Sequence, residues 1–277
     1  MTVLTRPMPL PRTTRGRARG SARWLGAALA SVVVAGSLLG WLAGPAVPVV
    51  SLLSCLLLAG VVGSQHDGHR FGAANVVTLA RGVGMSLIAG LTAEAWLAGL
   101  HAAAVVAAIT IGAVCIGLDG VDGKVARVRG EMSAFGARFD MEVDAATICV
   151  LSVAVVALGY AGWWVLAIGA MRYLYVAASW LVPALKIPVR VRVSGRAIAV
   201  AQGVSLLACL LLGLLHRTPA WWPSAIAAAA LAALTWSFGR DIVWQLRTAP
   251  AGSKVSALPA GSADESSADG RPAPVAA

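Results

Sequence analysis

Long apolar stretches recur along most of this chain, and short polar or glycine-proline breaks separate them. A helix that crosses the hydrocarbon core of a bilayer needs about 20 mainly apolar residues. Stretches of about that length, which we expect to be transmembrane helices, lie at about 24–43, 46–64, 75–93, 97–118, 137–160, 162–184, 197–216 and 221–243. The pattern therefore predicts an all-α integral membrane protein.

The two ends of the chain lack this pattern. Residues 1–23 are rich in arginine, and residues 248–277 are rich in alanine, serine, proline and glycine. Such segments bury too little apolar surface to offset the entropy of ordering. We therefore expect both to be disordered, the first as a basic cytoplasmic arm. Residues 24–64 are then a transmembrane hairpin, unless 24–43 is a cleaved signal, and 75–245 form a six-helix membrane domain.

The composition limits the kinds of partner. Of all residues, 58% are hydrophobic and 12% are charged, and the net charge is +10. In a soluble protein this charge would suggest nucleic acid, but here the basic residues lie between apolar runs. With a cytoplasmic N-terminus, Arg217 is the only basic residue in a loop on the opposite side, as the positive-inside rule describes. The distribution of basic residues therefore predicts which loops face the cytoplasm, and we expect no nucleic acid as a partner.

Half of the acidic residues fall in one segment between two predicted helices. Six of the twelve lie within residues 118–145. Asp119 and Asp122 are three residues apart at the end of one helix, and Asp140 and Asp144 are four apart in the next, so each pair lies on one helix face. We expect the short connection to fold the two helices side by side. Four carboxylates would then converge at the cytoplasmic interface.

Four such carboxylates repel one another unless protons or cations neutralise them. Oxygen ligands suit magnesium or manganese, and no His or Cys lies between Asp119 and Asp144 to favour zinc. Two ions about 3.5–4 Å apart would fit between the carboxylates. Lys124 and Arg127 would balance a pyrophosphate, and Gly136 would let the two helices pack closely.

The same segment resembles a known family. Eight positions within 26 residues match the signature of the CDP-alcohol phosphatidyltransferases (CDP-alcohol phosphotransferases), class I, in identity and spacing: Asp119, Asp122, Gly123, Ala126, Arg127, Gly136, Asp140 and Asp144. The resemblance covers residues 75–245 and implies a six-helix catalytic membrane domain, often homodimeric. It also implies transfer of a phosphatidyl group from CDP-diacylglycerol to an alcohol, with release of CMP, in phospholipid biosynthesis. The apolar hairpin at 24–64 is extra to this core.

The resemblance implies roles for individual residues. Two Mg²⁺ or Mn²⁺ ions would be held by Asp119, Asp122, Asp140 and Asp144, and Asp144 would also be the general base. The stretch "ANVVTLAR" resembles the family's first helix, although Ala74 stands where a proline is frequent. The implied contacts to the CDP donor are Asn75, Thr78, Gly123, Ala126, Arg127 and Ser133.

Other charged residues have two interpretations each. Arg172 lies within a predicted helix and Arg196 in a basic loop on the aspartate side. Both would bind a phosphate on the acceptor, such as glycerol phosphate or inositol phosphate. Alternatively, Arg172 extends to the interface and Arg196 is ordinary positive-inside charge. Glu142 faces away from the neighbouring aspartates, as a helix or dimer contact would.

A membrane transporter or ion carrier is the competing functional class, because carboxylates inside helical bundles also form cation pathways. The acidic residues lie at one membrane edge rather than at its middle, and the chain shows no inverted repeat. We therefore favour an enzyme of the cell membrane whose active site faces the cytoplasm and whose partners are membrane lipids. The alanine-rich composition indicates a bacterial source.

Overall fold

The computed structural model of the chain describes residues 14–64, 71–99, 102–129, 133–187, 193–216 and 221–249. These residues form helices and no strand, as the sequence predicts. The elements are α1 (Thr14–Ala43), α2 (Ala46–Ser64), α3 (Ala73–Leu97), α4 (Ala102–Arg129), α5 (Ala134–Ala157), the 3₁₀ helix η1 (Trp163–Val165), α6 (Leu166–Leu181), the 3₁₀ helix η2 (Pro183–Lys186), α7 (Val193–His216) and α8 (Trp221–Thr248).

Seven segments among the described residues are long and apolar enough to cross a membrane, and they lie in α1, α2, α3, α4, η1–α6, α7 and α8. The fold is therefore that of an all-α integral membrane protein. The predicted segment 137–160 falls in α5. This helix is long enough to cross a membrane, but it is not among the seven because it carries too many charged residues near its start. Asp140, Glu142 and Asp144 all lie in its first three turns.

Two predicted boundaries are wrong. We expected disorder up to residue 23, but α1 begins at Thr14, and α4 continues to Arg129 where we expected a loop after residue 118. The first extension holds four arginines and two alanines, which are good helix formers, whereas the second also contains glycine, valine and aspartate. Adding residues to an existing helix also costs less than starting a new one. Residues 1–13 and 250–277, which hold most of the predicted arm and tail, lie outside the described residues.

Helix α3 is the centre of the bundle, with 67% of its apolar window buried against 17–33% for the other six spans. It packs against α1, α2, α4 and α5, whereas direct packing between α4 and α5 is sparse among the described residues. The prediction that α4 and α5 fold side by side is therefore wrong. Glycines let neighbours approach α3 closely: a Cβ at Gly84 would lie 2.5 Å from Cys115 Sγ, and one at Gly90 would lie 2.5 Å from the Val47 carbonyl oxygen.

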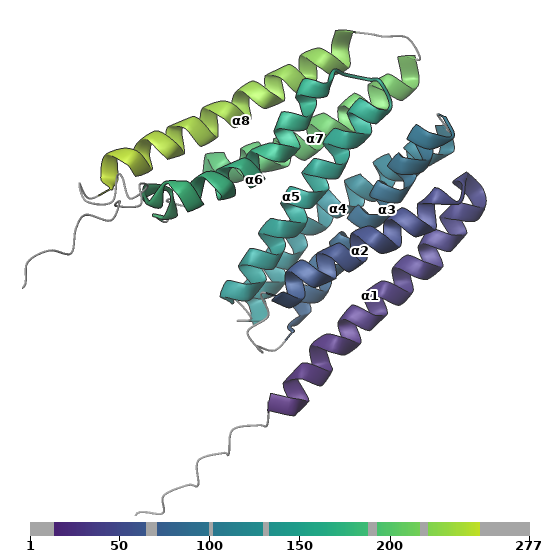
Figure 1. Cartoon of the computed structure of the whole chain (residues 1–277), viewed down its shortest axis with the longest axis horizontal. Helices are drawn as coiled ribbons and strands as arrows, with labels where there is room; N and C mark the ends of the chain where they lie inside the picture. Colours follow the sequence, from purple (N-terminus) through teal and green to yellow (C-terminus); the bar gives the residue numbers. More distant parts are fainter. Residues whose placement is uncertain are drawn as a thin grey trace, which may run out of the picture.

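The hairpin of α1 and α2 lies at one edge of the bundle, opposite α8 (Figure 1). The α1–α2 turn fits against Glu94, a buried residue near the end of α3. Its Oε2 accepts a hydrogen bond from the Ala46 backbone N–H at 2.7 Å, which satisfies a donor at the start of α2. Val47, Leu58 and Val62 are also buried. The hairpin is thus packed as part of the bundle.

Helices α6, α7 and α8 form the other side of the molecule (Figure 1). Helix α6 comes very close to α5, because a Cβ at Gly169 would lie 2.6 Å from the Cα of Cys149. At the other end of α6, the fully buried Gln245 of α8 holds η2 in place. Its Nε2 donates to the carbonyl oxygens of Leu185 at 3.1 Å and Ile187 at 2.7 Å. These bonds fix the start of the predicted basic loop.

Candidate active site

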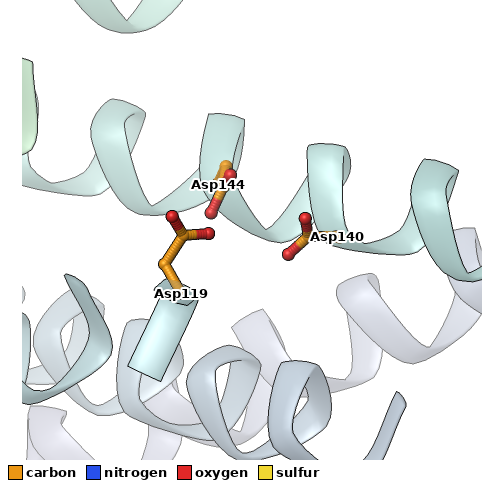
Figure 2. Close-up of side chains that lie close together, drawn as sticks. All are labelled: Asp119, Asp140 and Asp144. Atoms are coloured by element: carbon orange, nitrogen blue, oxygen red, sulfur yellow. The ribbon is translucent and has the colours of Figure 1, made fainter. Parts of the chain in front are cut away.

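Three of the four predicted aspartates meet in the structure. Asp140 and Asp144 project from successive turns of α5 toward Asp119, which comes from α4 (Figure 2). One carboxylate oxygen of each lies within 4.8 Å of the others. The side chain of Asp122, the fourth predicted ligand, lies outside the described part of the chain. Helix spacing aligned the α5 pair, as the sequence predicts.

The start of α5 sets the position of this pair. Ser133 is the N-cap, and its hydroxyl accepts a hydrogen bond from the Gly136 N–H at 2.9 Å. A Cβ at Gly136 would lie 2.8 Å from Asn75 Oδ1 of α3. The absence of a side chain at Gly136 therefore lets α3 pack closely against α5. Our prediction that it lets α4 and α5 pack closely is wrong, because α3 is the helix that reaches it.

A buried arginine connects the three carboxylates. Arg81 of α3 has only 3% of its surface exposed. Its Nη1 lies 2.6 Å from Asp140 Oδ1 and its Nη2 lies 3.0 Å from Asp119 Oδ1. Nη2 also donates to Asp144 Oδ1. Because α3 packs against both α4 and α5, the Arg81 side chain reaches carboxylates from both helices.

The cluster lines a cavity of about 410 Å³. The rest of the lining comes from α4, α5, α6, α7 and α8 and is mostly apolar. The residues that line the cavity outside the cluster include Gly120, Gly123, Met141, Ile148, Ile168, Gly169, Val200, Leu234 and Phe238. A cavity with a charged cluster and a mostly apolar lining suits a substrate that has a phosphate group and a hydrocarbon part.

Two more polar residues line this cavity. Arg172 of α6 donates from Nη2 to Glu142 Oε1 at 3.1 Å, so Glu142 makes a contact between helices, one of the two roles we expected for it. Gln202 of α7 is 2% exposed, and its Nε2 donates to the Ala230 carbonyl oxygen at 2.8 Å. Its Oε1 has no hydrogen-bond partner among the described residues. The cavity lining thus includes polar side chains from α6 and α7 besides the aspartates.

The predicted donor contacts are divided by the structure. Gly123 lines the cavity. Asn75 and Thr78 are buried on α3 outside the cavity lining, and the Thr78 hydroxyl donates to the Ala74 carbonyl oxygen at 3.2 Å. Ser133 caps α5, as described above. The side chains of Ala126, Arg127 and Arg196 lie outside the described part of the chain.

The comparisons with known proteins agree with this geometry. The sequence model of the CDP-alcohol phosphatidyltransferase family matches residues 71–238, which is more than half of the chain. The chain is a member of this family. No curated protein and no solved structure matches the chain. The match begins just before α3 and ends within α8, so the α1–α2 hairpin lies outside the family's core.

CDP-alcohol phosphatidyltransferases are transferases of lipid synthesis that move a phosphatidyl group and depend in general on divalent metal ions. The aspartate cluster fits such an ion chemically. It offers three carboxylates from two helices within reach of one position, and carboxylate oxygens are the ligands that Mg²⁺ and Mn²⁺ prefer. Among the described side chains, Arg81 pairs with all three carboxylates, and a divalent cation would add further positive charge to the cluster.

We predicted no role for Arg81 or Gln202 from the sequence. Arg81 lies inside the predicted helix 75–93, three residues after Thr78 and therefore on a similar face. A charged residue within an apolar helix is costly, by about 2.5–3.5 kcal/mol on insertion scales, and is a signal of function. The arginine in the predicted helix 75–93 was such a signal, and it indicated that an acidic side chain would lie beside Arg81. Gln202 gave the weaker signal of a polar amide in an apolar run.

Proposed function

We propose that this protein transfers a phosphatidyl group from CDP-diacylglycerol to the hydroxyl of an alcohol acceptor and releases CMP. The observation that carries this proposal is the meeting of three aspartates in the lining of a mostly apolar cavity. A lipid-linked pyrophosphate has the matching division into charged and hydrocarbon parts. Family membership supports the reaction type.

Asp119, Asp122, Asp140 and Asp144 would hold two Mg²⁺ or Mn²⁺ ions. Such ions, when bound, polarise the donor's pyrophosphate and stabilise the charge on the departing phosphate of CMP. Both α5 ligands project from one face of a helix whose start is capped by Ser133, so their spacing is fixed before substrate arrives. Fixed ligands reduce the reorganisation needed at the moment of reaction.

Asp144 is our candidate for the general base. It lines the cavity and lies one turn deeper along α5 than Asp140. The acceptor oxygen forms a bond to the phosphatidyl phosphorus, the bond from that phosphorus to the CMP oxygen breaks, and the acceptor proton passes to Asp144. We propose a single displacement with no covalent enzyme intermediate.

The nucleotide part of the donor would lie along α4. Gly123 lines the cavity, and the absence of a side chain leaves room for a nucleotide beside the helix. Ala126 and Arg127 follow on the same helix and would contact the pyrophosphate or the base. Asn75, Thr78 and Ser133 would complete the donor contacts, and Asn75 lies against the first turn of α5 through Gly136.

The acceptor would occupy the region near Arg172 and Gln202. We propose that Arg172 and Arg196 bind a phosphate on the acceptor, as in glycerol phosphate or inositol phosphate. Arg172 supports this role because it lines the same cavity as the aspartates. Equal transfer to phosphorylated and unphosphorylated forms of one acceptor would contradict it.

The arrangement in the membrane is also a proposal. Basic residues between apolar segments favour a cytoplasmic active site. We propose that the α1–α2 hairpin is retained, since α1 packs against α2 and α3, and that two copies form a homodimer in a bacterial cell membrane. Intact-mass measurement of the protein purified from membranes tests retention, because cleavage after α1 would remove the mass of that helix.

The deciding experiment measures CMP release by the purified protein. The reaction contains CDP-diacylglycerol, Mg²⁺ or Mn²⁺ and one acceptor at a time from a panel, and the lipid product is identified by mass spectrometry. We expect release that depends on both the acceptor and the metal and stops on addition of EDTA. A transporter or ion carrier would release no CMP under any of these conditions.

A further inference from the structure

Arg81 occupies the position where the three carboxylates come closest together. Its guanidinium uses Oδ1 of each aspartate, with Nη1 2.6 Å from Asp140 and Nη2 3.0 Å from Asp119 and bonded to Asp144. The side chain is 4% exposed, so water contributes little to its solvation. The carboxylates therefore stabilise the charged guanidinium in its buried position, and the guanidinium reduces the repulsion among the carboxylates.

A divalent cation would need the same oxygen atoms. Mg²⁺ binds carboxylate oxygens at about 2.0–2.1 Å, whereas a charged N–H···O bond places nitrogen about 2.7–2.9 Å from oxygen. An ion coordinated by these oxygens would also face the buried, positive guanidinium of Arg81 at short range, and like charges repel. The two cations are alternatives for this set of oxygens.

We propose that Arg81 is a built-in counter-cation of the aspartate cluster, which holds Asp119, Asp140 and Asp144 together before metal binds and competes with the metal for them. The inference rests on the proposed function, because it needs a divalent cation at this cluster. It assigns Arg81 as a positioning residue that weakens metal affinity and prevents mutual repulsion of the carboxylates. Metal binding then releases the guanidinium from the cluster, beside the place where the donor's phosphates would lie.

The direction in which removal of Arg81 changes metal affinity distinguishes a competing cation from a residue that only orients the metal ligands. If Arg81 only orients the aspartates as ligands, its removal weakens metal binding. If Arg81 competes, its removal tightens metal binding, although the metal-free protein becomes less stable because three carboxylates lose their counter-charge. The two roles therefore predict opposite changes in the dissociation constant for metal.

The experiment measures Mn²⁺ binding to the full-length protein in detergent, from the electron paramagnetic resonance signal of free Mn²⁺, with no donor or acceptor present. The variants are Arg81→Gln, which removes the charge, and Arg81→Lys, which keeps it but has no planar fork to reach three carboxylates. Arg240→Gln is the control, since Arg240 lies on α8 outside this cavity and pairs with Asp241.

We expect Arg81→Gln to bind Mn²⁺ about tenfold more tightly than wild type, as loss of a competing charged hydrogen-bond partner would give. Arg81→Lys should bind more tightly by a smaller factor, and Arg240→Gln should match wild type. The melting temperature of Arg81→Gln should fall in EDTA and rise more than that of wild type when Mn²⁺ is added.

Weaker or unchanged Mn²⁺ binding in Arg81→Gln overturns the inference while leaving the proposed function intact. If Arg81→Gln does not fold, Arg81→Lys decides, because equal or weaker binding by that variant also overturns it. Failure of the wild-type protein to bind Mn²⁺ overturns both the inference and the proposed metal site.

Discussion

Arg172 of α6 and Glu142 of α5 form an ion pair, with Nη2 3.1 Å from Oε1, at the edge of the cavity that holds the aspartates. The pair offers a test of acceptor binding. Glu142→Gln removes the charge that competes for Arg172, so we expect the KM for a phosphorylated acceptor to fall or stay the same. Arg172→Gln should raise this KM about tenfold, because hydrogen bonds to charged groups contribute about 1.5–3 kcal/mol.

Steady-state kinetics with phosphorylated and unphosphorylated forms of the acceptor measure both effects. The Arg172→Gln effect should be confined to the phosphorylated form. Equal losses of kcat in the two variants, with KM unchanged, would instead identify the pair as a structural contact between α5 and α6.

Replacement of Asp144 by Asn tests the general base. We expect CMP release to fall by about 10²–10⁴-fold, the usual contribution of a positioned proton acceptor, with the melting temperature close to that of wild type. Asp241→Asn is a matched control, because Asp241 lies on α8 outside the cavity and pairs with Arg240. Wild-type activity in Asp144→Asn would remove this residue from the chemistry.

Gly169 tests the close contact between α5 and α6. An added Cβ would lie 2.6 Å from the Cys149 Cα, a backbone atom that cannot move aside alone. Gly169→Ala should therefore lower the free energy of unfolding by about 1–3 kcal/mol, which thermal unfolding in detergent measures. Gly60→Ala is the control, since nothing lies within 4 Å of its added Cβ. Equal melting temperatures for the two variants would contradict the predicted contact.

Glu94 tests how the hairpin is held. Glu94→Ala leaves the partly buried Ala46 N–H without its acceptor at 2.7 Å, and loss of a hydrogen bond costs about 0.5–1.5 kcal/mol. We expect a lower melting temperature with kcat unchanged, because Glu94 does not line the catalytic cavity. Glu94→Gln retains an acceptor oxygen and should lose less stability. A Glu94→Ala protein with wild-type stability would show that this bond contributes nothing.

The sequence predicted most of the helices because apolar length is a local property. Hydropathy located α2 and α7 closely, and i, i+4 spacing placed Asp140 and Asp144 on one face of α5. The neighbours of each helix depend on packing between distant segments. Glycines such as Gly84 and Gly136 mark close approach, but they do not say which helix approaches. For that reason we predicted α4 as the neighbour of α5, whereas in the structure the neighbour is α3. We also missed the role of Arg81.

Helix α5 differs from the other long helices in a way that affects how the protein is made. Its acidic residues prevent it from qualifying as a membrane span by its own composition. Asp140 and Asp144 pair with Arg81, which is synthesised earlier, and Glu142 pairs with Arg172, which is synthesised later. We therefore expect insertion of α5 to be a cooperative step, in which α3 is already present and α6 follows, so that these half-buried charges are compensated.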